Sequence, residues 1–295
     1  MISALLMDRL NKEFDGRLSL AIIIFNNQYP RKFLHQLVSG QLDTDRMDYL
    51  NRDSFFTGVS EGVISFDRII KMLSIKDDEL VVEAKGIYSV EKFLIARRLM
   101  YWQVYLHKTV ISAEQMLIKT LKRARMLCQK GEVLSASPAF AHFLYGQLDA
   151  VSFVKDPAHL DWFTKLDDTD ILSAIKAWET HNDAVLRMLC QRLLRRNLFV
   201  TEMRSYSFEQ EEIDDVKRKA KEHFQLEDGD VDYLVYHQEV QNSAYNAEKE
   251  PIKILNNRGE LMEIAEASDL SNLEALSRRV VKYALTYPKE LRVVE

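Results

Sequence analysis

Apolar residues recur every three or four positions along most of the chain that precedes residue 198. Ile2, Leu6 and Leu10 follow this spacing and predict an amphipathic helix, which Asp15-Gly16 ends. The same spacing predicts further helices over residues 18–26, 31–38, 44–56, 66–73, 90–108, 111–129, 134–145 and 172–196. We expect Ser65 and Ser89 to cap the helices that follow them. Only nine glycines and five prolines interrupt the chain, so helix should dominate.

The pattern changes near residue 198. Strand-like runs are predicted at residues 199–203, 231–240, 252–255 and 261–264. Asn256-Asn257-Arg258-Gly259 is typical of a hairpin turn between the last two, and residues 80–84 and 86–88 predict a smaller hairpin earlier in the chain. Helices over residues 209–223 and 272–286 should flank the strands. The sequence therefore predicts a mainly α protein with helical regions at 1–130 and 131–197 and a small α+β lobe at 198–295.

Composition narrows the class of protein. The chain has 295 residues, of which 47% are hydrophobic and 29% charged, an ordinary balance for a globular protein. Its net charge is −5 and it has no large basic block, which gives no signal for nucleic-acid binding. Cys128 and Cys190 stand far apart and do not have the spacing of metal ligands, so we interpret both as free thiols of a reducing compartment. The apolar run at 20–25 is too short to cross a bilayer, and the N-terminus lacks the basic start of a signal peptide. We therefore expect a cytoplasmic protein without a membrane partner.

Candidate chemistry is concentrated in residues 40–58, GQLDTDRMDYLNRDSFFTG. With Asp43 as N-cap of a helix over 44–56, one face of that helix carries Asp45, Tyr49, Arg52 and Asp53. Met47 and Leu50 point elsewhere and can anchor the helix in a core. The simplest interpretation of the charges is a solvated helix face, with Asp48 and Arg52 as an i,i+4 ion pair worth about 0.3 kcal/mol. A cleft that binds a metal ion and a polyanion is the alternative.

The run at 42–53, LDTDRMDYLNRD, resembles the last signature of the HD-domain metal phosphohydrolases. It is most similar to the branch of the SAM-and-HD-domain dNTP triphosphohydrolase and its bacterial relatives, whose pattern is (I/L)-D-x-D-(K/R)-x-D-Y-x-x-R-D. The match has no gap. The resemblance implies that Asp45 is a metal ligand, that Arg46 touches substrate phosphates, and that Tyr49 and Asp53 line the nucleotide pocket.

The resemblance extends through residues 90–108, where the family pattern is R-x-x-x-(H/Y)-x-x-x-Y-x-H-K. It implies that Arg97 binds the terminal phosphate and that Tyr105 lies against the nucleotide. A guanidinium suits the first role because it is always charged and can bind phosphate oxygens bidentately. His107 and Lys108 match positions near an effector site or a subunit contact. On helical spacing, Arg97, Tyr101, Tyr105 and Lys108 share one polar-aromatic face, and within it we interpret Tyr101 as an aromatic that fills core space.

The other metal ligands of that family, a His and a His-Asp pair, have no counterpart in these residues. The sequence contains no His-Asp dipeptide, and its seven histidines do not form the pattern. Asp167, Asp168 and Asp170 have no histidine beside them, and we interpret this run as a helix cap. One carboxylate cannot hold a divalent ion such as Mg, Mn, Fe or Zn, because such sites need about three or more protein ligands. We therefore expect residues 1–130 to be the C-terminal part of an HD-like helical bundle, in a chain that is inactive alone and whose catalytic residues are unknown.

Two functions follow from these patterns. The first is a dNTP triphosphohydrolase-like enzyme, which releases a deoxynucleoside and triphosphate and, as the family implies, forms a homo-oligomer. The second is a non-catalytic nucleotide-binding or protein-interaction module, and whether this chain is an enzyme stays open between them. We also expect apolar surface to be exposed on the helices within residues 1–58, and the isolated chain to associate as a result.

Overall fold

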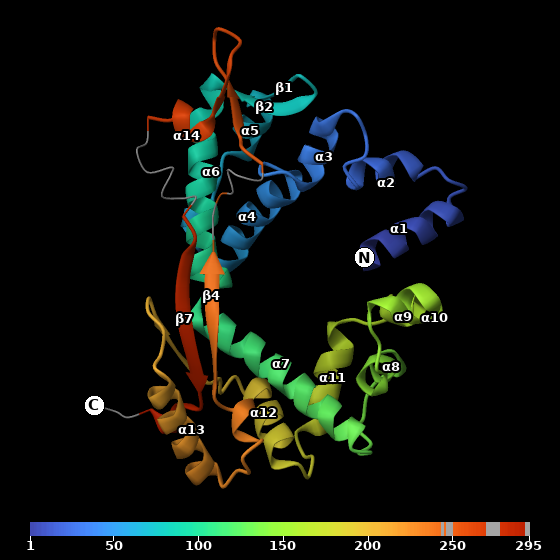
Figure 1. Cartoon of the computed structure of the whole chain (residues 1–295), viewed down its shortest axis with the longest axis vertical. Coiled ribbons are helices and arrows are strands. Elements are labelled where there is room, and N and C mark those ends of the chain that lie inside the picture. Colours follow the sequence, from blue (N-terminus) through green and yellow to red (C-terminus); the bar gives the residue numbers. More distant parts are fainter. Residues whose placement is uncertain (243–244, 246–249, 270–277, 293–295) are drawn as a thin grey trace. The chain divides into compact units, whose positions relative to one another are not determined.

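The computed structural model describes residues 1–242, 245, 250–269 and 278–292, and it is mainly helical (Figure 1). Its contacts divide the chain into two compact units. The first, here the site unit, comprises Met7–His107 and Gln241–Val281. The second, the central unit, comprises Met1–Leu6, Lys108–Val240 and Lys282–Glu295. Each unit therefore combines segments from distant parts of the chain, and the division cuts across the ranges 1–130, 131–197 and 198–295.

Helices form most of the site unit. In chain order they are α1 (Ile2–Glu13), which begins in the central unit, α2 (Ser19–Phe25), α3 (Lys32–Ser39), α4 (Thr44–Thr57), η1 (Ser60–Gly62), α5 (Phe66–Met72), η2 (Ala84–Gly86), α6 (Ile87–Met100), the π-helical turn η3 (Tyr101–Tyr105) and α14 (Ile264–Ala267). The predicted stop after α1 is confirmed, since Asp15 and Gly16 both take positive φ angles. Ser65 precedes α5, but its side chain makes no capping hydrogen bond, so that cap was wrong.

A four-stranded sheet completes the site unit, with the order β1 (Leu73–Lys76), β2 (Glu79–Glu83), β5 (Lys253–Leu255), β6 (Leu261–Glu263). The β5–β6 hairpin confirms the turn predicted at 256–259. The hairpin predicted between 80–84 and 86–88 is wrong, because β2 pairs with the preceding β1 instead. Asp77 and Asp78 form that turn with positive φ angles. Gly86 has another role: a Cβ there would lie 2.7 Å from Val82 and 2.8 Å from Met72, so it allows close packing before α6.

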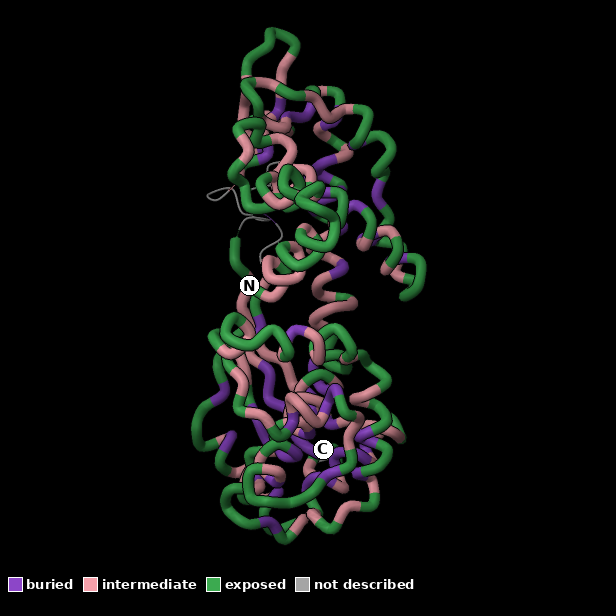
Figure 2. The backbone as a smooth tube through the Cα atoms, turned by 90° about the vertical axis from the view of Figure 1, so that its right-hand side faces the viewer, coloured by how far each residue is buried: buried purple, intermediate pink, exposed green. Residues whose placement is uncertain are grey.

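Buried stretches occur in both units (Figure 2), and each unit has hydrophobic clusters of its own. In the site unit, Leu50 of α4 and Phe93 of α6 are both 0% exposed, and the cluster continues to Val82 and Ile254 of the sheet. Met47 and Leu50 anchor α4, as predicted. This core fixes α4 against α6.

The helix predicted over 90–108 differs from the structure at both ends. Helix α6 begins at Ile87 after Gly86 and has no side-chain cap, so Ser89 lies inside the helix. At the other end the backbone widens into the π-turn, where the amide of Leu106 donates to the carbonyl of Tyr101 at 2.7 Å. A new helix then begins at Lys108, in the other unit. The prediction that Lys108 shares a helix face with Arg97 and Tyr105 is therefore wrong.

The central unit is built from helices around a three-stranded sheet. Its elements are α7 (Lys108–Gln129), α8 (Pro138–Tyr145), α9 (Ala150–Lys155), α10 (Ala158–Phe163), α11 (Asp168–Trp178), α12 (Ala184–Leu194), β3 (Val200–Arg204), α13 (Gln210–Phe224), η4 (Val231–Tyr233), β4 (Tyr236–Asn242), β7 (Val280–Tyr287) and η5 (Lys289–Leu291). The sheet order is β3-β7-β4. Asp167 caps α11 by accepting hydrogen bonds from the amides of Thr169 and Asp170, which confirms the capping interpretation.

Three predictions fail in this unit. The helix expected over 172–196 is two helices, α11 and α12. The strand expected at 231–240 begins only at Tyr236, because residues 231–233 form a 3-10 turn. Residues 272–277 of the helix expected at 272–286 lie outside the described residues, and residues 280–286 belong to strand β7. That strand pairs with β3, where the buried hydroxyls of Thr201 and Thr286 lie 2.9 Å apart. Cross-strand pairing thus overrides the local helical spacing.

The first helices of the site unit leave apolar side chains exposed, as predicted. None of the residues of α1, α2 or α3 is buried. On α4, Phe55 and Phe56 are 80% and 78% exposed and contact each other edge to face. Among the described residues, no helix has both the length and the apolar character needed to cross a membrane.

Candidate functional site

Helix α4 is the platform of the candidate site, and Asp43 fixes its start. The side chain of Asp43 accepts a hydrogen bond from the Arg46 amide at 2.8 Å, so the predicted N-cap is confirmed. Asp43 is only 3% exposed, and this burial raises its pKa although the neighbouring Arg46 lowers it. Asp45 lies in the first turn and is exposed. The cap thus presents Asp45 to solvent from a rigid helix end.

Arg46 is held close to the same helix end. Its Nη1 donates to the Gly40 carbonyl at 2.6 Å and also pairs with the Asp43 carboxylate. A buried carboxylate needs such a partner, because an unpaired buried charge is costly. Part of the charge of Arg46 is therefore already neutralised by Asp43.

The next turns of α4 meet the π-turn at the end of α6. The Tyr105 hydroxyl donates to Asp53 Oδ2 at 2.6 Å, and the ring of Tyr105 lies edge to face with Tyr49, with centroids 6.0 Å apart. Burial raises the pKa of Tyr105 above its ordinary value, and the hydrogen bond to Asp53 adds to that rise. Tyr101 is half-buried and lies edge to face with Tyr105. Three tyrosines and one carboxylate therefore form a continuous polar-aromatic surface, in a widened helix of the kind often found at functional sites.

Arg97 of α6 lies on the same side of the site unit. Its Nη1 donates to Gln41 Oε1 at 3.3 Å, and its Nε is buried without a hydrogen-bond partner among the described residues. Burial raises the pKa of Tyr49, and the positive charges of Arg97 and Arg46 oppose that rise. The structure thus brings Arg46, Tyr49 and Arg97 within electrostatic range of one another.

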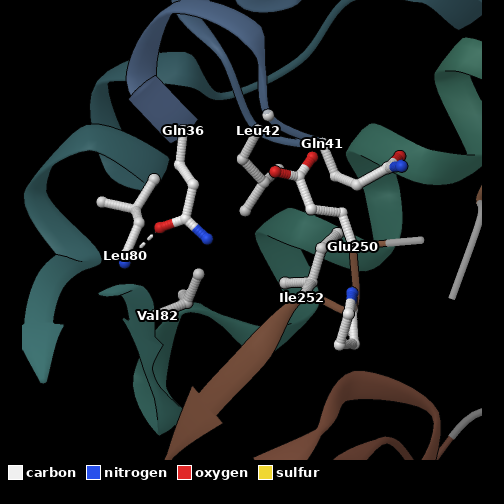
Figure 3. A pocket seen from close by; sticks show the side chains of 9 residues that line it. Gln36, Gln41, Leu42, Leu80, Val82, Glu250 and Ile252 are labelled. Atoms are coloured by element: carbon white, nitrogen blue, oxygen red, sulfur yellow. Dashed lines mark hydrogen bonds between the residues drawn. The ribbon is translucent and has the colours of Figure 1, made fainter. Parts of the chain in front are cut away.

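A small pocket lies beside the segment that leads into α4 (Figure 3). Its lining includes Gln36, Gln41, Leu42 and Glu250, and its volume of about 30 Å³ has room for one or two water molecules. Burial raises the pKa of Glu250, while the charges of His35 and Arg46 lower it. Sequence reasoning missed both Gln41 and Glu250. Gln41 stood inside the quoted run as a polar residue before the cap, whereas Glu250 reaches the pocket from a distant segment and had no local signal.

Other residues singled out from sequence lie elsewhere. Arg52 forms the expected exposed ion pair with Asp48 at 2.5 Å. His107 ends the site unit, whereas Lys108 begins α7 in the central unit. There Lys108 lines a groove together with Arg196, Arg204, Lys289 and Arg292. The two residues expected near an effector site or subunit contact thus belong to different units.

The described residues do not supply a complete metal site. Within them, no group of three or more His, Cys, Asp or Glu side chains is arranged to hold a metal ion. Asp45 offers one exposed carboxylate, and divalent ions require several oriented donors. The donor set therefore does not fit a metal ion held by these residues alone.

Comparisons with known proteins agree with the sequence motifs. Residues 64–135 match the family described as the HD associated region. A solved phosphohydrolase structure from Bacteroides thetaiotaomicron is 48% identical and superimposes with a TM-score of 0.92, covering 97% of this chain and 71% of that one. An uncharacterised Bacillus subtilis protein, YwfO, is 34% identical over 271 residues, which are 89% of this chain and 59% of the relative.

A more distant relative has a named activity. The deoxynucleoside triphosphate triphosphohydrolase SAMHD1 homologue of Dictyostelium discoideum is 27% identical over 130 residues, covering 43% of this chain and 25% of that protein. This chain thus spans less than two thirds of the length of each of these two curated relatives.

Proposed function

Because this chain belongs to the HD-domain phosphohydrolase family, we propose that it binds a nucleoside triphosphate for hydrolysis. The proposed binding surface is the one shared by α4, α6 and the π-turn. A deoxynucleoside triphosphate is the proposed substrate, and a deoxynucleoside and triphosphate are the proposed products. The name of the Dictyostelium relative supports this choice of substrate. The observation that carries the proposal is the arrangement of two guanidiniums beside a tyrosine-carboxylate surface within one compact unit.

The arginines suit the triphosphate. Arg97 has a neutral hydrogen-bond partner, Gln41, so its charge is available to an anion. Arg46 is already paired with Asp43 and adds a weaker positive potential at the helix start, where the helix dipole is also positive. Guanidinium groups bind phosphate oxygens through directional, charge-assisted hydrogen bonds. We therefore assign the terminal phosphate to Arg97 and a more internal phosphate to Arg46.

The tyrosine surface suits the nucleoside. Tyr49 and Tyr105 present aromatic rings against which a sugar or base can pack. Asp53, fixed by the Tyr105 hydroxyl, keeps a second oxygen that can accept a hydrogen bond from a sugar hydroxyl. These three residues would orient the nucleoside while the arginines hold its phosphates.

Asp45 is the proposed link to a divalent metal ion. It is exposed on the same helix as Arg46 and Tyr49, and it would be one ligand of that ion. The remaining donors would come from outside the described residues of this chain. Catalysis would therefore require a chain that also carries the family's His and His-Asp ligands.

The direct test is nucleotide hydrolysis with Mn²⁺ or Mg²⁺, on this chain and on an extended chain that includes His and His-Asp ligands. We expect deoxynucleoside and triphosphate from the extended chain only. Asp45→Ala should abolish the activity, and Arg97→Ala should lower it by about a hundredfold, because a charged contact to the transferred group is lost. Asp48→Ala, which alters an exposed ion pair on the same helix, is the matched control and should leave the activity unchanged.

A non-catalytic nucleotide-binding module is the second candidate. The observation that favours it is the lack of a three-donor metal cluster among the described residues. Nucleotide binding without hydrolysis in both chains would support this candidate and would contradict the enzymatic proposal.

A further inference from the structure

Two adjacent residues before the α4 cap touch both arginines of the site. The carbonyl of Gly40 accepts from Arg46 Nη1 at 2.6 Å, and the side-chain carbonyl of Gln41 accepts from Arg97 Nη1 at 3.3 Å. The turn that carries them is tightly packed: a Cβ at Gly40 would lie 2.4 Å from the Gln36 carbonyl oxygen, so only glycine fits. The close contact between Gly40 and Gln36 therefore restricts the backbone immediately before Gln41.

Arg97 depends on Gln41 more than Arg46 depends on any one partner. Arg46 has two acceptors, the Gly40 carbonyl and the Asp43 carboxylate, whereas the only side-chain acceptor of Arg97 among the described residues is Gln41. The buried Nε of Arg97 has no partner within this part of the chain. A long side chain with one anchor loses its orientation when that anchor is removed, because many rotamers become accessible.

The chemistry of the anchor also matters. Gln41 is neutral, so it orients the guanidinium without cancelling its charge. A carboxylate at this position would compete with a phosphate for the same N–H groups. Figure 3 shows Gln41 beside Leu42 at the edge of the small pocket, on the segment that leads into α4.

We infer that Gln41 is a positioning residue that orients the Arg97 guanidinium toward a phosphate group. The inference rests on the proposed function, since it names the residue that prepares the proposed phosphate contact. Gln41 itself does not touch the phosphate, and its effect passes through Arg97.

The test uses the 295-residue chain and inorganic triphosphate as the probe, with no metal added. The Nε–Hε resonance of Arg97 is assigned from its loss in Arg97→Lys and is then followed by ¹H–¹⁵N NMR. Gln41→Leu removes the acceptor at nearly constant size. Gln41→Glu restores an acceptor but adds a charge. Gln28→Leu changes an exposed glutamine of the same unit and is the matched control.

We expect Gln41→Leu to shift or broaden the Arg97 resonance and to weaken triphosphate binding by about tenfold, the size of one hydrogen bond to a charged group. Gln41→Glu should return the resonance close to its original position, yet bind triphosphate no better than Gln41→Leu. Gln28→Leu should match the parent chain in both measurements. The resonance reports directly on Arg97, so a general loss of structure, which would move many resonances, is distinguished from the specific effect.

Two outcomes would overturn parts of this account separately. If Gln41→Leu changed neither the Arg97 resonance nor the triphosphate affinity, the positioning role would be overturned. If neither the parent chain nor any variant bound triphosphate, the proposed function would be contradicted instead, and the response of the resonance would still decide whether Gln41 orients Arg97.

Discussion

The hydroxyl of Tyr105 donates a 2.6 Å hydrogen bond to the carboxylate of Asp53, and this contact joins α4 to the π-turn that ends α6. The two residues are 52 positions apart in the chain. The bond fixes the carboxylate and the ring of Tyr105 together. It is therefore both a structural link and a feature of the proposed nucleoside surface.

The Tyr105–Asp53 contact predicts a loss of stability at alkaline pH. Burial raises the pKa of Tyr105 in the folded protein, with the Asp53 hydrogen bond adding to the rise. Because this pKa is raised, the Tyr105 hydroxyl contributes fully to folding stability below its pKa in the unfolded chain, which is about 10. That contribution is lost as the pH rises toward the pKa of Tyr105 in the folded protein. Tyr105→Phe should cost about 1 kcal/mol at pH 7. Above pH 10, the unfolding free energy of this variant should fall less steeply than that of the parent chain, as measured by urea titration.

Other buried tyrosines share this behaviour, so the comparison must be made between proteins. Burial also raises the pKa of Tyr236, Tyr245 and Tyr287. The quantity of interest is thus the difference in unfolding free energy between Tyr105→Phe and the parent chain at each pH. A difference that stays constant from pH 7 to pH 11 would contradict the assignment.

The N-cap at Asp43 predicts a local stability effect. Asp43→Ala removes the cap of α4 and leaves Arg46 without its carboxylate, so we expect a loss of about 2 kcal/mol in urea unfolding. Asp43→Asn keeps an oxygen that can accept a hydrogen bond from the Arg46 amide, so its unfolding free energy should lie closer to that of the parent chain. The exposed Asp48 gives the control, since Asp48→Ala should change the unfolding free energy by less than about 0.5 kcal/mol. Equal losses for Asp43→Ala and Asp48→Ala would argue against the cap.

Gly62 sets how closely α4 and α6 approach. A Cβ at this buried position would lie 2.5 Å from Met100 Sδ and 2.9 Å from Ser54 Cβ. Met100 can move its side chain, but the Ser54 contact is rigid, so Gly62→Ala should destabilise the chain by about 1–2 kcal/mol. Gly229→Ala is the control, because nothing lies within 4 Å of a Cβ there. Thermal unfolding of the two variants side by side measures the difference, and identical melting temperatures would contradict the close contact.

The exposed apolar residues of the site unit predict association. Helices α1 to α3 have no buried residues, and Phe55 and Phe56 of α4 are largely exposed. Exposed apolar patches of this kind mark surfaces that bind another apolar surface. We expect light scattering to detect concentration-dependent association of the chain, reduced in the double variant Phe55→Ser, Phe56→Ser. A monodisperse monomer at all concentrations would count against this prediction.

Local features of the site could be predicted from sequence. The Asp43 cap, the helical span of α4 and the anchors Met47 and Leu50 depend on neighbouring residues alone, and each was found as expected. The motif resemblance also pointed to Asp53 and Tyr105 as parts of one surface, although no local rule relates residues so far apart.

The features that failed depend on distant contacts. Strand β7 has residues at helical spacing, but pairing with β3 decides its conformation. The π-turn ends at Tyr105 and a new helix begins at Lys108, so Lys108 does not continue the helical spacing of Arg97. The contact between Gln41 and Arg97 spans 56 positions and becomes visible only when α4 packs on α6. Tertiary packing thus determines those features of the fold and of the site that could not be predicted from the local pattern of residues.

The most direct test of the central claim is the affinity of this chain for a deoxynucleoside triphosphate, measured by calorimetry for the parent, Arg97→Ala and Arg52→Ala. Both variants remove one arginine from the site unit, but Arg52 is exposed and paired with Asp48. We expect Arg97→Ala to weaken binding by about tenfold or more and Arg52→Ala to change it little. Equal affinities for all three proteins would contradict a phosphate-binding role for the surface shared by α4 and α6.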